Sequence, residues 1–306
     1  MANYRQSKIH HNLLLRSQII QAVRRFFSER QYLEVETPVR IPAPAPEAHI
    51  DAVATGQWFL QTSPELCMKM LLAAGFPRIF QICKCFRNQE RGTKHLPELT
   101  MLEWYRAGGN YLSLMEECEE LLIYVANCLG RRKKLSYRSR QIELPRPWTI
   151  LPVADAFRKY GSQSMDEAIA DGSFDEVMAF EIEPQLGAPV PVFLCDYPAQ
   201  HGALARLKPR DPLLAERFEL YVAGVELCNG FSELIDAAEQ RERFKKEQKL
   251  RRSLNKTVYP MPHKFLDALG DMPEACGNAL GLDRLVMLFA DTDNIDDVVA
   301  FTPEEL

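Results

Sequence analysis

One short, charged stretch of the chain contains an arginine and several other polar side chains that could take part in chemistry. Residues 86–105 read Phe-Arg-Asn-Gln-Glu-Arg-Gly-Thr-Lys-His-Leu-Pro-Glu-Leu-Thr-Met-Leu-Glu-Trp-Tyr. Apolar runs on both sides predict two strands, and a glycine and a proline favour a long loop between them. Arg87, at the end of the first strand, suits a polyphosphate because its planar guanidinium can bind two oxygens at once. Glu103 and Tyr105 are two apart on the second strand and share one face. Taken alone, the stretch could also be a charged surface hairpin.

A second group of acidic side chains lies on a hairpin predicted within residues 217–235. Ala223-Gly224 can form a two-residue turn that places Tyr221 opposite Glu226. Glu219 is then on the same face as Glu226, one diagonal step away. Two such carboxylates repel each other unless a cation lies between them, and Mg²⁺ bound to nucleotide phosphates is a natural occupant. Scattered glutamates on an exposed hairpin are the alternative interpretation.

A third block, residues 277–289, reads Gly-Asn-Ala-Leu-Gly-Leu-Asp-Arg-Leu-Val-Met-Leu-Phe. Its small residues predict a strand that leads directly into a helix. The apolar residues of that helix recur at helical spacing, and Arg284 lies off their face.

Helices and strands must position these groups, and the apolar spacing predicts several of them. Ser63 can cap a helix, Pro64 fits its first position and Glu65 suits its first turn. Residues 239–256 predict a charged, solvated helix, with docking of an acidic partner as the alternative. Residues 131–200 show no pattern that indicates chemistry. The other predicted elements are a helix over 14–30, an extended run over 32–39, a polyproline-type link over 42–46, a strand over 58–61 and a packing helix over 112–129.

The composition is that of a globular protein. The chain has 306 residues, 46% of them apolar, which is enough for one large domain or two ordinary ones. Its net charge of −5 argues against a large nucleic-acid-binding face, which needs basic side chains. None of the eight cysteines forms a Cys-x-x-Cys pair, so we do not expect a zinc site. The sequence shows no secretory signal or membrane-length apolar run, so we expect a reduced, cytoplasmic protein.

Together, these blocks resemble the catalytic domain of the class II aminoacyl-tRNA synthetases. Residues 86–105 resemble motif 2 in its lysyl-tRNA synthetase form, and 277–289 resemble motif 3, whose arginine lies against adenine. Residues 14–39 resemble motif 1, which builds the dimer interface in that family. The resemblance implies an α+β fold over residues 1–306, with an antiparallel sheet flanked by helices. It also implies a homodimer joined through residues 14–39.

The resemblance further implies a role for each matching residue. The implied reaction is attack of an amino-acid carboxylate on ATP, with Arg87 and Arg284 as catalytic residues. The implied ligands of Mg²⁺ are Glu219 and Glu226. The residues implied to bind ATP are Arg87, Asn88, Gln89, His95, Leu96, Leu99, Glu226, Leu227, Gly281 and Arg284. The residues implied to bind a cationic amino acid are Ser63, Pro64, Glu65, Glu103, Tyr105, Glu233 and Ala279.

The start of the chain distinguishes it from the lysyl-tRNA synthetases. Those enzymes carry an N-terminal OB-fold domain that reads the anticodon, and because we predict the first helix near Leu14 we expect no such domain in this sequence. The chain is more similar to stand-alone paralogues that activate (R)-β-lysine and transfer it to a lysine of elongation factor P. Ala279 supports the similarity to these paralogues, because lysyl-tRNA synthetases usually have glycine at this position. One methyl group can bias substrate choice by ~1–3 kcal/mol. The implied partners are elongation factor P and a small amino acid, without direct tRNA binding.

Three positions depart from the motif 2 pattern. Gln89 replaces a glutamate that meets the adenine amino group, Leu96 replaces an asparagine, and Leu99 replaces a phenylalanine expected to stack on adenine. Gln89 keeps an acceptor oxygen, and Leu99 keeps an apolar contact. Two alternatives therefore stay open: a truncated synthetase that charges tRNA or another small acceptor, and a catalytically silent binding protein on the same scaffold.

Overall fold

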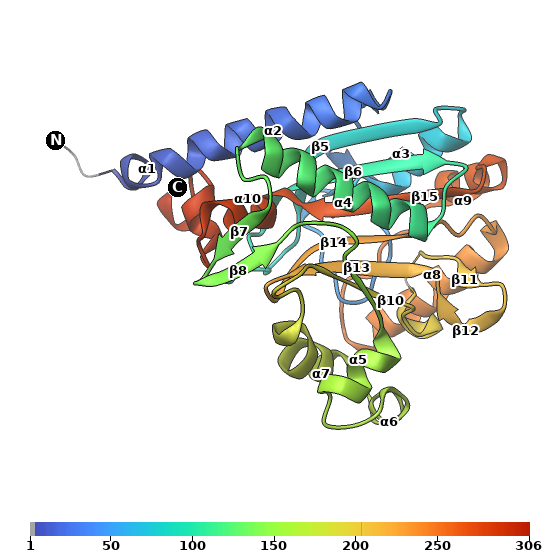
Figure 1. Ribbon diagram of the computed structural model, residues 1–306. Coiled ribbons are helices and arrows are strands. Elements are labelled where there is room, and N and C mark those ends of the chain that lie inside the picture. Colours follow the sequence, from blue (N-terminus) through green and yellow to red (C-terminus); the bar gives the residue numbers. More distant parts are fainter. Residues whose placement is uncertain (1–3, 203) are drawn as a thin grey trace.

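One large sheet organises the backbone (Figure 1). The structure is a computed structural model that describes residues 4–202 and 204–306. Within these ranges, eight strands pair in the order β1-β5-β6-β15-β14-β13-β10-β9. Their bounds are β1 (Leu33–Glu34), β5 (Arg78–Phe86), β6 (Glu98–Ala107), β9 (Thr149–Pro152), β10 (Val192–Cys195), β13 (Arg217–Val222), β14 (Val225–Ser232) and β15 (Ala275–Gly281).

The pairing directions confirm the predicted fold class. The strands from β5 to β10 in this order pair antiparallel. The edge strands β1 and β9 pair in parallel with β5 and β10. The fold is therefore α+β, with an antiparallel central sheet that gains a parallel strand at each edge.

Three helices cover one face of the sheet (Figure 1): α2 (His10–Glu29), α4 (Tyr111–Cys128) and α10 (Leu282–Ala290). They and the sheet enclose the larger core, in which Phe27 stacks on Phe80 with ring centroids 4.8 Å apart. Asn110 caps α4, because its side chain accepts from two backbone N–H groups of the first turn. The helices predicted over 14–30 and 112–129 are confirmed, although α2 begins earlier, at His10. Among the described residues, no helix has both the length and the apolarity needed to cross a bilayer.

The opposite face of the sheet packs against α3 (Glu65–Ala73), α8 (Ala237–Ser253) and α9 (His263–Ala268). These helices share a second core with side chains from β5, β6 and β14. Neighbouring residues on β6 show the alternation, because Trp104 packs in the larger core and Tyr105 packs in the second core. The face with Tyr105 therefore carries the candidate site.

Residues 131–200 hold more structure than the sequence indicated. They supply β9 and β10, a hairpin of β7 (Lys134–Tyr137) and β8 (Arg140–Glu143), and the short helices α5 (Val153–Tyr160), α6 (Met165–Asp171) and α7 (Phe174–Val177). These helices share a small core with residues of β10 and β13 and lie near the end of the sheet formed by β10 and the edge strand β9 (Figure 1). Elements this short contain too few periods for a sequence pattern to reveal them.

The extended run predicted over 32–39 is only partly a strand. Residues Leu33–Glu34 pair with β5, and the strand ends before Pro38, which has no backbone N–H to donate. The predicted strand over 58–61 is confirmed as β4. The remaining elements are α1 (Arg5–Lys8), β2 (Arg40–Ile41), β3 (Ala54–Thr55), β4 (Trp58–Leu60), β11 (Leu207–Lys208), β12 (Asp211–Ala215) and the short helical turns η1 (Met178–Ile182), η2 (Glu183–Gln185), η3 (Ala199–His201), η4 (Leu269–Asp271), η5 (Ile295–Val298) and η6 (Pro303–Glu305).

The charged helix predicted over 239–256 forms as α8, but one of its cations is not solvated. The Arg251 side chain is fully buried. Its Nη1 donates to the carbonyl oxygens of Glu47 (2.6 Å) and Ile50 (3.0 Å), and its Nη2 donates to Asp51 Oδ1 (2.6 Å). Residues 47–51 form no helix or strand, so their carbonyl oxygens need side-chain donors. The prediction of a solvated helix is therefore wrong at this position.

Replacing Arg251 should destabilise the fold far more than replacing its neighbour. Arg251→Leu leaves the carbonyl oxygens of Glu47 and Ile50 without this donor and leaves Asp51 with Lys256 as its remaining ion-pair partner, so we expect the free energy of unfolding to fall by about 3 kcal/mol. Arg252→Leu is the matched control, because Arg252 is exposed on the same turn of α8. Urea unfolding monitored by circular dichroism measures both changes. Equal losses in the two variants would contradict the structural role of Arg251.

Candidate active site

Side-chain alternation brings two predicted site residues together on β6. The Tyr105 hydroxyl donates to Glu103 Oε2 (2.7 Å), so the prediction that these residues share one face is confirmed. On the neighbouring strand β15, Gly277 pairs with Tyr105 and Ala279 pairs with Glu103. The small residues of β15 therefore lie beside the two polar side chains of β6.

The start of α3 is bonded directly to this part of the sheet. Ser63 Oγ donates to Glu103 Oε1 (2.6 Å). Ser63 Oγ also accepts from the backbone N–H of Glu65 (3.0 Å), although Ser63 precedes the N-cap and is not the cap residue that the sequence predicted. The helix begins at Glu65, so Pro64 is its N-cap and not, as predicted, its first helical residue.

The sequence reasoning missed one cation of this site. Lys69 lies one turn after Glu65 on α3, and its side chain is fully buried. Its Nζ lies 2.5 Å from Glu65 Oε1 and 2.5 Å from Glu233 Oε2, and the Glu233 side chain is also fully buried. The i,i+4 spacing of Glu65 and Lys69 was a usable signal. The contact with Glu233 joins distant parts of the chain, so no local pattern predicts it.

Two carboxylates, Glu65 and Glu233, contact this one lysine, and Glu103 is held on the same face of the sheet by Ser63 and Tyr105. We call Glu65, Glu103, Glu233 and Lys69 the acidic cluster. Burial, reinforced by the charge of Glu65, raises the pKa of Glu103 to about 7. Burial also raises the pKa of Glu233 to about 8, although Lys69 opposes the rise. Burial disfavours the charge on Lys69, but the two carboxylates outweigh that effect and raise its pKa. The cluster therefore holds protons near neutral pH that a second cation would displace.

Gly277 allows the acidic cluster and Tyr105 to approach each other. A Cβ atom at position 277 would lie 2.3 Å from two ring carbons of Tyr105 and 2.5 Å from Glu233 Oε1. These distances are far inside van der Waals contact, so any side chain would separate the two groups.

The predicted hairpin forms from β13 and β14, with a change in its register. Tyr221 pairs with Glu226 as predicted. A bulge at Leu227 then shifts the pairing, so Glu219 lies opposite Asn229 and farther along the strand than a regular ladder would place it. Leu227 itself packs in the larger core.

Glu219 is surrounded by donors. Arg217 Nη2 lies 2.6 Å from Oε1, and the hydroxyls of Tyr197 and Tyr221 donate to Oε2 at 2.6 and 2.7 Å. Burial raises the pKa of Glu219; Arg217 opposes this rise and the nearby charge of Glu226 adds to it. The two carboxylates of the hairpin therefore repel each other, as the sequence predicted.

Arg284 connects the hairpin with the loop between β5 and β6. Its Nη1 donates to Glu226 Oε2 (2.9 Å), and its Nη2 donates to His95 Nε2 (2.6 Å). Burial and the charge of Arg284 lower the pKa of His95, so a neutral imidazole accepts this hydrogen bond. Burial opposes the charge on Glu226, but Arg284 outweighs it and the pKa of Glu226 lies below its ordinary value. The structure therefore brings these three predicted ATP-binding residues together.

Arg87 follows the end of β5, and its charge acts on both groups of residues. It lowers the pKa values of Glu103 in the acidic cluster and of Glu226 on the hairpin. Its Nε is buried, and no described residue accepts a hydrogen bond from it. Its Nη1 lies 3.7 Å from Glu90 Oε2. A buried, unused N–H group on a cation favours an incoming anion.

The other predicted ATP-binding residues lie in different surroundings. Asn88 and Gln89 are exposed, and the backbone N–H of Asn88 donates to Asp51 O (2.6 Å), within the segment that Arg251 holds. Leu96 is buried in the larger core, whereas Leu99 is half-buried on β6. Two further predicted site residues lie on β15. Gly281 is the last residue of that strand, and Ala279 lies between Glu103 and Asn229.

The hairpin carboxylates fit a magnesium ion only together with a nucleotide. In residues 4–202 and 204–306, no group of three or more His, Cys, Asp or Glu side chains could hold a metal ion. Mg²⁺ commonly takes one or two carboxylates and completes its shell with phosphate oxygens and water. Glu219 and Glu226 could supply those two carboxylates.

This antiparallel sheet, with an arginine after β5 and a second arginine after β15, is the arrangement expected of a class II synthetase catalytic domain. The family described as tRNA synthetases class II (D, K and N) matches residues 1–305, and the chain belongs to this family. The chain is also similar to proteins named elongation factor P--(R)-beta-lysine ligase. The protein from Erwinia tasmaniensis is 40% identical over 95% of this chain and 94% of its own length. Those from Edwardsiella ictaluri and Vibrio cholerae are 40% and 38% identical, over 99% and 94% of this chain and 98% and 93% of their own lengths. The resemblance inferred from the motifs is confirmed.

A methyl group at position 277 should disturb the site. Gly277→Ala drives Tyr105 and Glu233 apart, and we expect the free energy of unfolding to fall by about 1–3 kcal/mol, as for other overpacked positions. Gly270→Ala is the control, because a Cβ atom there would meet nothing within 4 Å. Urea unfolding measures both, and a Gly277→Ala variant as stable as the intact chain would contradict the close packing.

Proposed function

We propose that this chain uses ATP to activate (R)-β-lysine as an aminoacyl-adenylate and then transfers it to a lysine side chain of elongation factor P. The names of relatives that align over nearly the whole of both chains support the substrate and the acceptor. Membership of the class II synthetase family supports the use of ATP.

The observation that carries the proposal is the acidic cluster beside Arg87. Burying a cation or a carboxylate alone is costly, so a site with three carboxylates and one lysine favours a second cation. The ammonium group of a lysine-like substrate supplies that charge. The unpaired Nε of Arg87 favours an anion, and the α-phosphate of ATP supplies it.

Activation joins the two substrates. A carboxylate oxygen of the amino acid attacks the α-phosphorus of ATP and forms a new P–O bond. The bond from that phosphorus to the bridging oxygen of the β-phosphate breaks, and pyrophosphate leaves with the electron pair. Arg87 offsets the negative charge that develops on the α-phosphate oxygens in the transition state.

The groups around the hairpin hold the rest of the nucleotide. Arg284 and His95 bind the triphosphate tail, with Arg284 also lying against adenine. Glu219 and Glu226 hold Mg²⁺, which supplies positive charge to the phosphates when bound. Gln89 accepts a hydrogen bond from the adenine amino group, and Leu99 supplies apolar contact in place of an aromatic ring.

Transfer completes the reaction. The neutral side-chain amine of the acceptor lysine attacks the carbonyl carbon of the adenylate. A C–N bond forms, the C–O bond to AMP breaks, and AMP leaves with the electron pair while the nitrogen loses a proton to solvent. Ala279, which lies beside Glu103, shapes the pocket for the β-amino acid.

We further propose that residues 1–306 form one catalytic domain that pairs as a homodimer through residues 14–39. Leu14, Leu33 and Val39 support this interface, because they are large apolar side chains exposed on one segment. The net charge of −5 supports a reaction without direct tRNA binding. Eight free cysteines support a reduced, cytoplasmic setting.

ATP–pyrophosphate exchange tests the activation step directly. We expect exchange with (R)-β-lysine, weaker exchange with α-lysine or ornithine, and none without an amino acid. Arg87→Ala should reduce the rate by about 100-fold or more, because it removes charge stabilisation in the transition state. Arg78→Ala, at the opposite end of β5, should leave the rate near that of the intact chain.

The outcomes separate the proposal from its alternatives. Exchange with (R)-β-lysine should be followed by a mass gain of one β-lysyl group on elongation factor P. Exchange with α-lysine alone, together with charging of tRNA, would favour a truncated synthetase. A folded chain that binds ATP and shows no exchange would favour a silent scaffold.

The affinity for the cationic substrate should rise with pH. Glu103 and Glu233 have pKa values of about 7 and about 8 in the free site, well above the usual carboxyl value, so they are partly protonated at neutral pH. The incoming ammonium favours the ionised carboxylates and displaces protons, whereas the ammonium itself stays charged to a pH of about 10. Each proton displaced changes affinity by up to about tenfold per pH unit. We therefore expect the Kd for lysine to fall by about 100-fold or more between pH 6 and pH 8 and to level off once both carboxyl groups are ionised.

Calorimetry across this pH range measures the effect. Glu233→Gln cannot ionise at this position and should flatten the profile. Norleucine, which lacks the side-chain ammonium, is the ligand control and should bind weakly at every pH. A pH-independent Kd for lysine in the intact chain would show that the cluster carboxylates do not receive the ammonium.

A further inference from the structure

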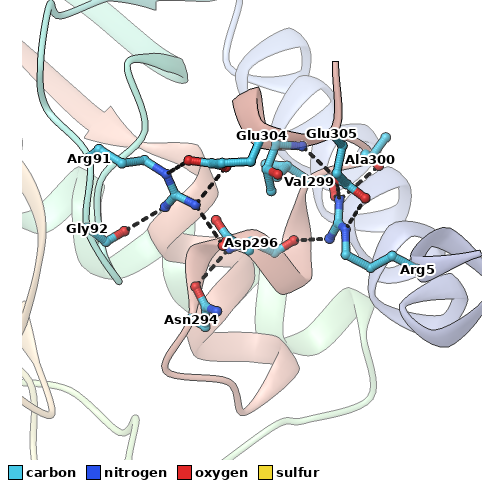
Figure 2. Close-up of polar contacts among 10 residues, drawn as sticks. Arg5, Arg91, Gly92, Asn294, Asp296, Val299, Ala300, Glu304 and Glu305 are labelled. Atoms are coloured by element: carbon cyan, nitrogen blue, oxygen red, sulfur yellow. Dashed lines mark hydrogen bonds and ion pairs between the residues drawn. The ribbon is translucent and has the colours of Figure 1, made fainter.

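The C-terminal segment holds the loop between β5 and β6, residues 87–97, from outside the candidate site (Figure 2). Arg91 extends from this loop. Its Nε and Nη2 donate to Glu304 Oε1 (2.9 Å) and Oε2 (3.1 Å), and Nη2 also donates to Asp296 Oδ2 (2.9 Å). Two parallel N–H groups on one carboxylate combine strength with directional specificity. We call Asp296 and Glu304 the C-terminal clamp.

The clamp is built on fixed backbone. Asp296 O accepts from Arg5 Nη1 (2.6 Å), which ties its segment to α1. Glu304 lies in η6, whose start is closed by a capping box. The backbone also takes part, because the N–H of Ile295 donates to Thr93 O (2.8 Å). The loop is therefore bound by side chains at Arg91 and by the main chain two residues later.

The other side of the same loop reaches Arg284. Lys94 O accepts from Arg284 Nε (3.3 Å), and His95 Nε2 accepts from Arg284 Nη2 (2.6 Å). Both contacts lie within four residues of Arg91. Displacement of the loop at Arg91 would therefore move the groups that orient Arg284.

We infer that Arg91 is a positioning residue for ATP. Held by the C-terminal clamp, it keeps His95 and Arg284 together in the arrangement that receives the triphosphate. Arg91 contacts no reacting atom and acts through the loop. This inference rests on the proposed function for the identity of the nucleotide. The contacts are partly exposed, so their loss weakens ATP binding without abolishing it.

Two variants that break the clamp and one matched control test the inference. Arg91→Met and Glu304→Gln remove the bidentate pair from opposite sides. Glu305→Gln is the control, because Glu305 is adjacent in sequence but pairs with Arg5 of α1 and not with the loop (Figure 2). Glutamine at position 305 keeps the side-chain acceptor of the η6 capping box, so the support of Glu304 is retained. In pyrophosphate exchange we expect the KM for ATP to rise about five- to tenfold in both clamp variants, a coupling at the low end of the usual range. The KM for the amino acid should stay within about twofold, which general destabilisation would not produce. Arg91→Lys keeps the charge without the fork and should give an intermediate KM for ATP.

A second readout needs no catalysis. The backbone groups of Gly92 and His95 hydrogen-bond to each other across the loop. Their amide hydrogen exchange should quicken about five- to tenfold in the two clamp variants and not in Glu305→Gln. This measurement uses the unliganded chain, so it stands even if no amino acid is activated, and calorimetry with ATP then replaces the KM. Unchanged amide exchange in the clamp variants, faster exchange with an unchanged affinity for ATP, or an equal effect in Glu305→Gln would each overturn the inference.

Discussion

The site depends on keeping three carboxylates and one lysine together in a buried space. Lys69 lies 2.5 Å from both Glu65 and Glu233, and Ser63 and Tyr105 donate to Glu103. Desolvation of several like charges is compensated only when donors and cations lie close to them. Gly277 on β15 makes this close packing possible, because a side chain at position 277 would separate Tyr105 from Glu233. The burial that makes the cluster costly in the free protein is also the reason for proposing that it binds a second cation.

The charges on the site face are divided between two groups. The acidic cluster holds more carboxylates than cations, whereas Glu219 and Glu226 on the hairpin are paired with Arg217 and Arg284. Arg87 influences both groups, and its Nε has no described partner. The hairpin carboxylates thus occupy positive charges that a polyphosphate could take over, whereas Arg87 is paired only with Glu90, at 3.7 Å, among the described residues. This division of charge suits two reactants of opposite charge that must come together in one site.

The sequence predicted what depends on local periodicity and missed what depends on register or distance. Alternation placed Glu103 and Tyr105 on one face, and the turn chemistry placed Tyr221 opposite Glu226. The bulge that moves Glu219 interrupts the alternation, because the adjacent Leu227 and Cys228 both pack in the larger core. Two adjacent apolar residues also occur in regular strands that are buried on both faces, so they did not identify the bulge. Arg251 was misjudged for a related reason, since its partners are carbonyl oxygens that only the tertiary fold brings near. Lys69 was within reach of the i,i+4 rule, but its burial and its second carboxylate were not.

The loop after β5 shows why remote parts of the chain matter to the site. The paired residues of β5 and β6 end at Phe86, and one more backbone bond follows, from the N–H of Arg87 to Pro97 O (2.9 Å), so the residues after Arg87 need other supports. Near the strand, Asn88 is bonded to the segment that the buried Arg251 holds. Farther out, Arg91 is held by partly exposed carboxylates. Buried side chains whose hydrogen bonds are all satisfied resist local unfolding, whereas exposed ion pairs contribute little stability and are easily broken. The part of the loop next to Arg87 is therefore fixed, and the part that carries His95 can adjust, as expected if charge is stabilised at one end while a nucleotide enters at the other.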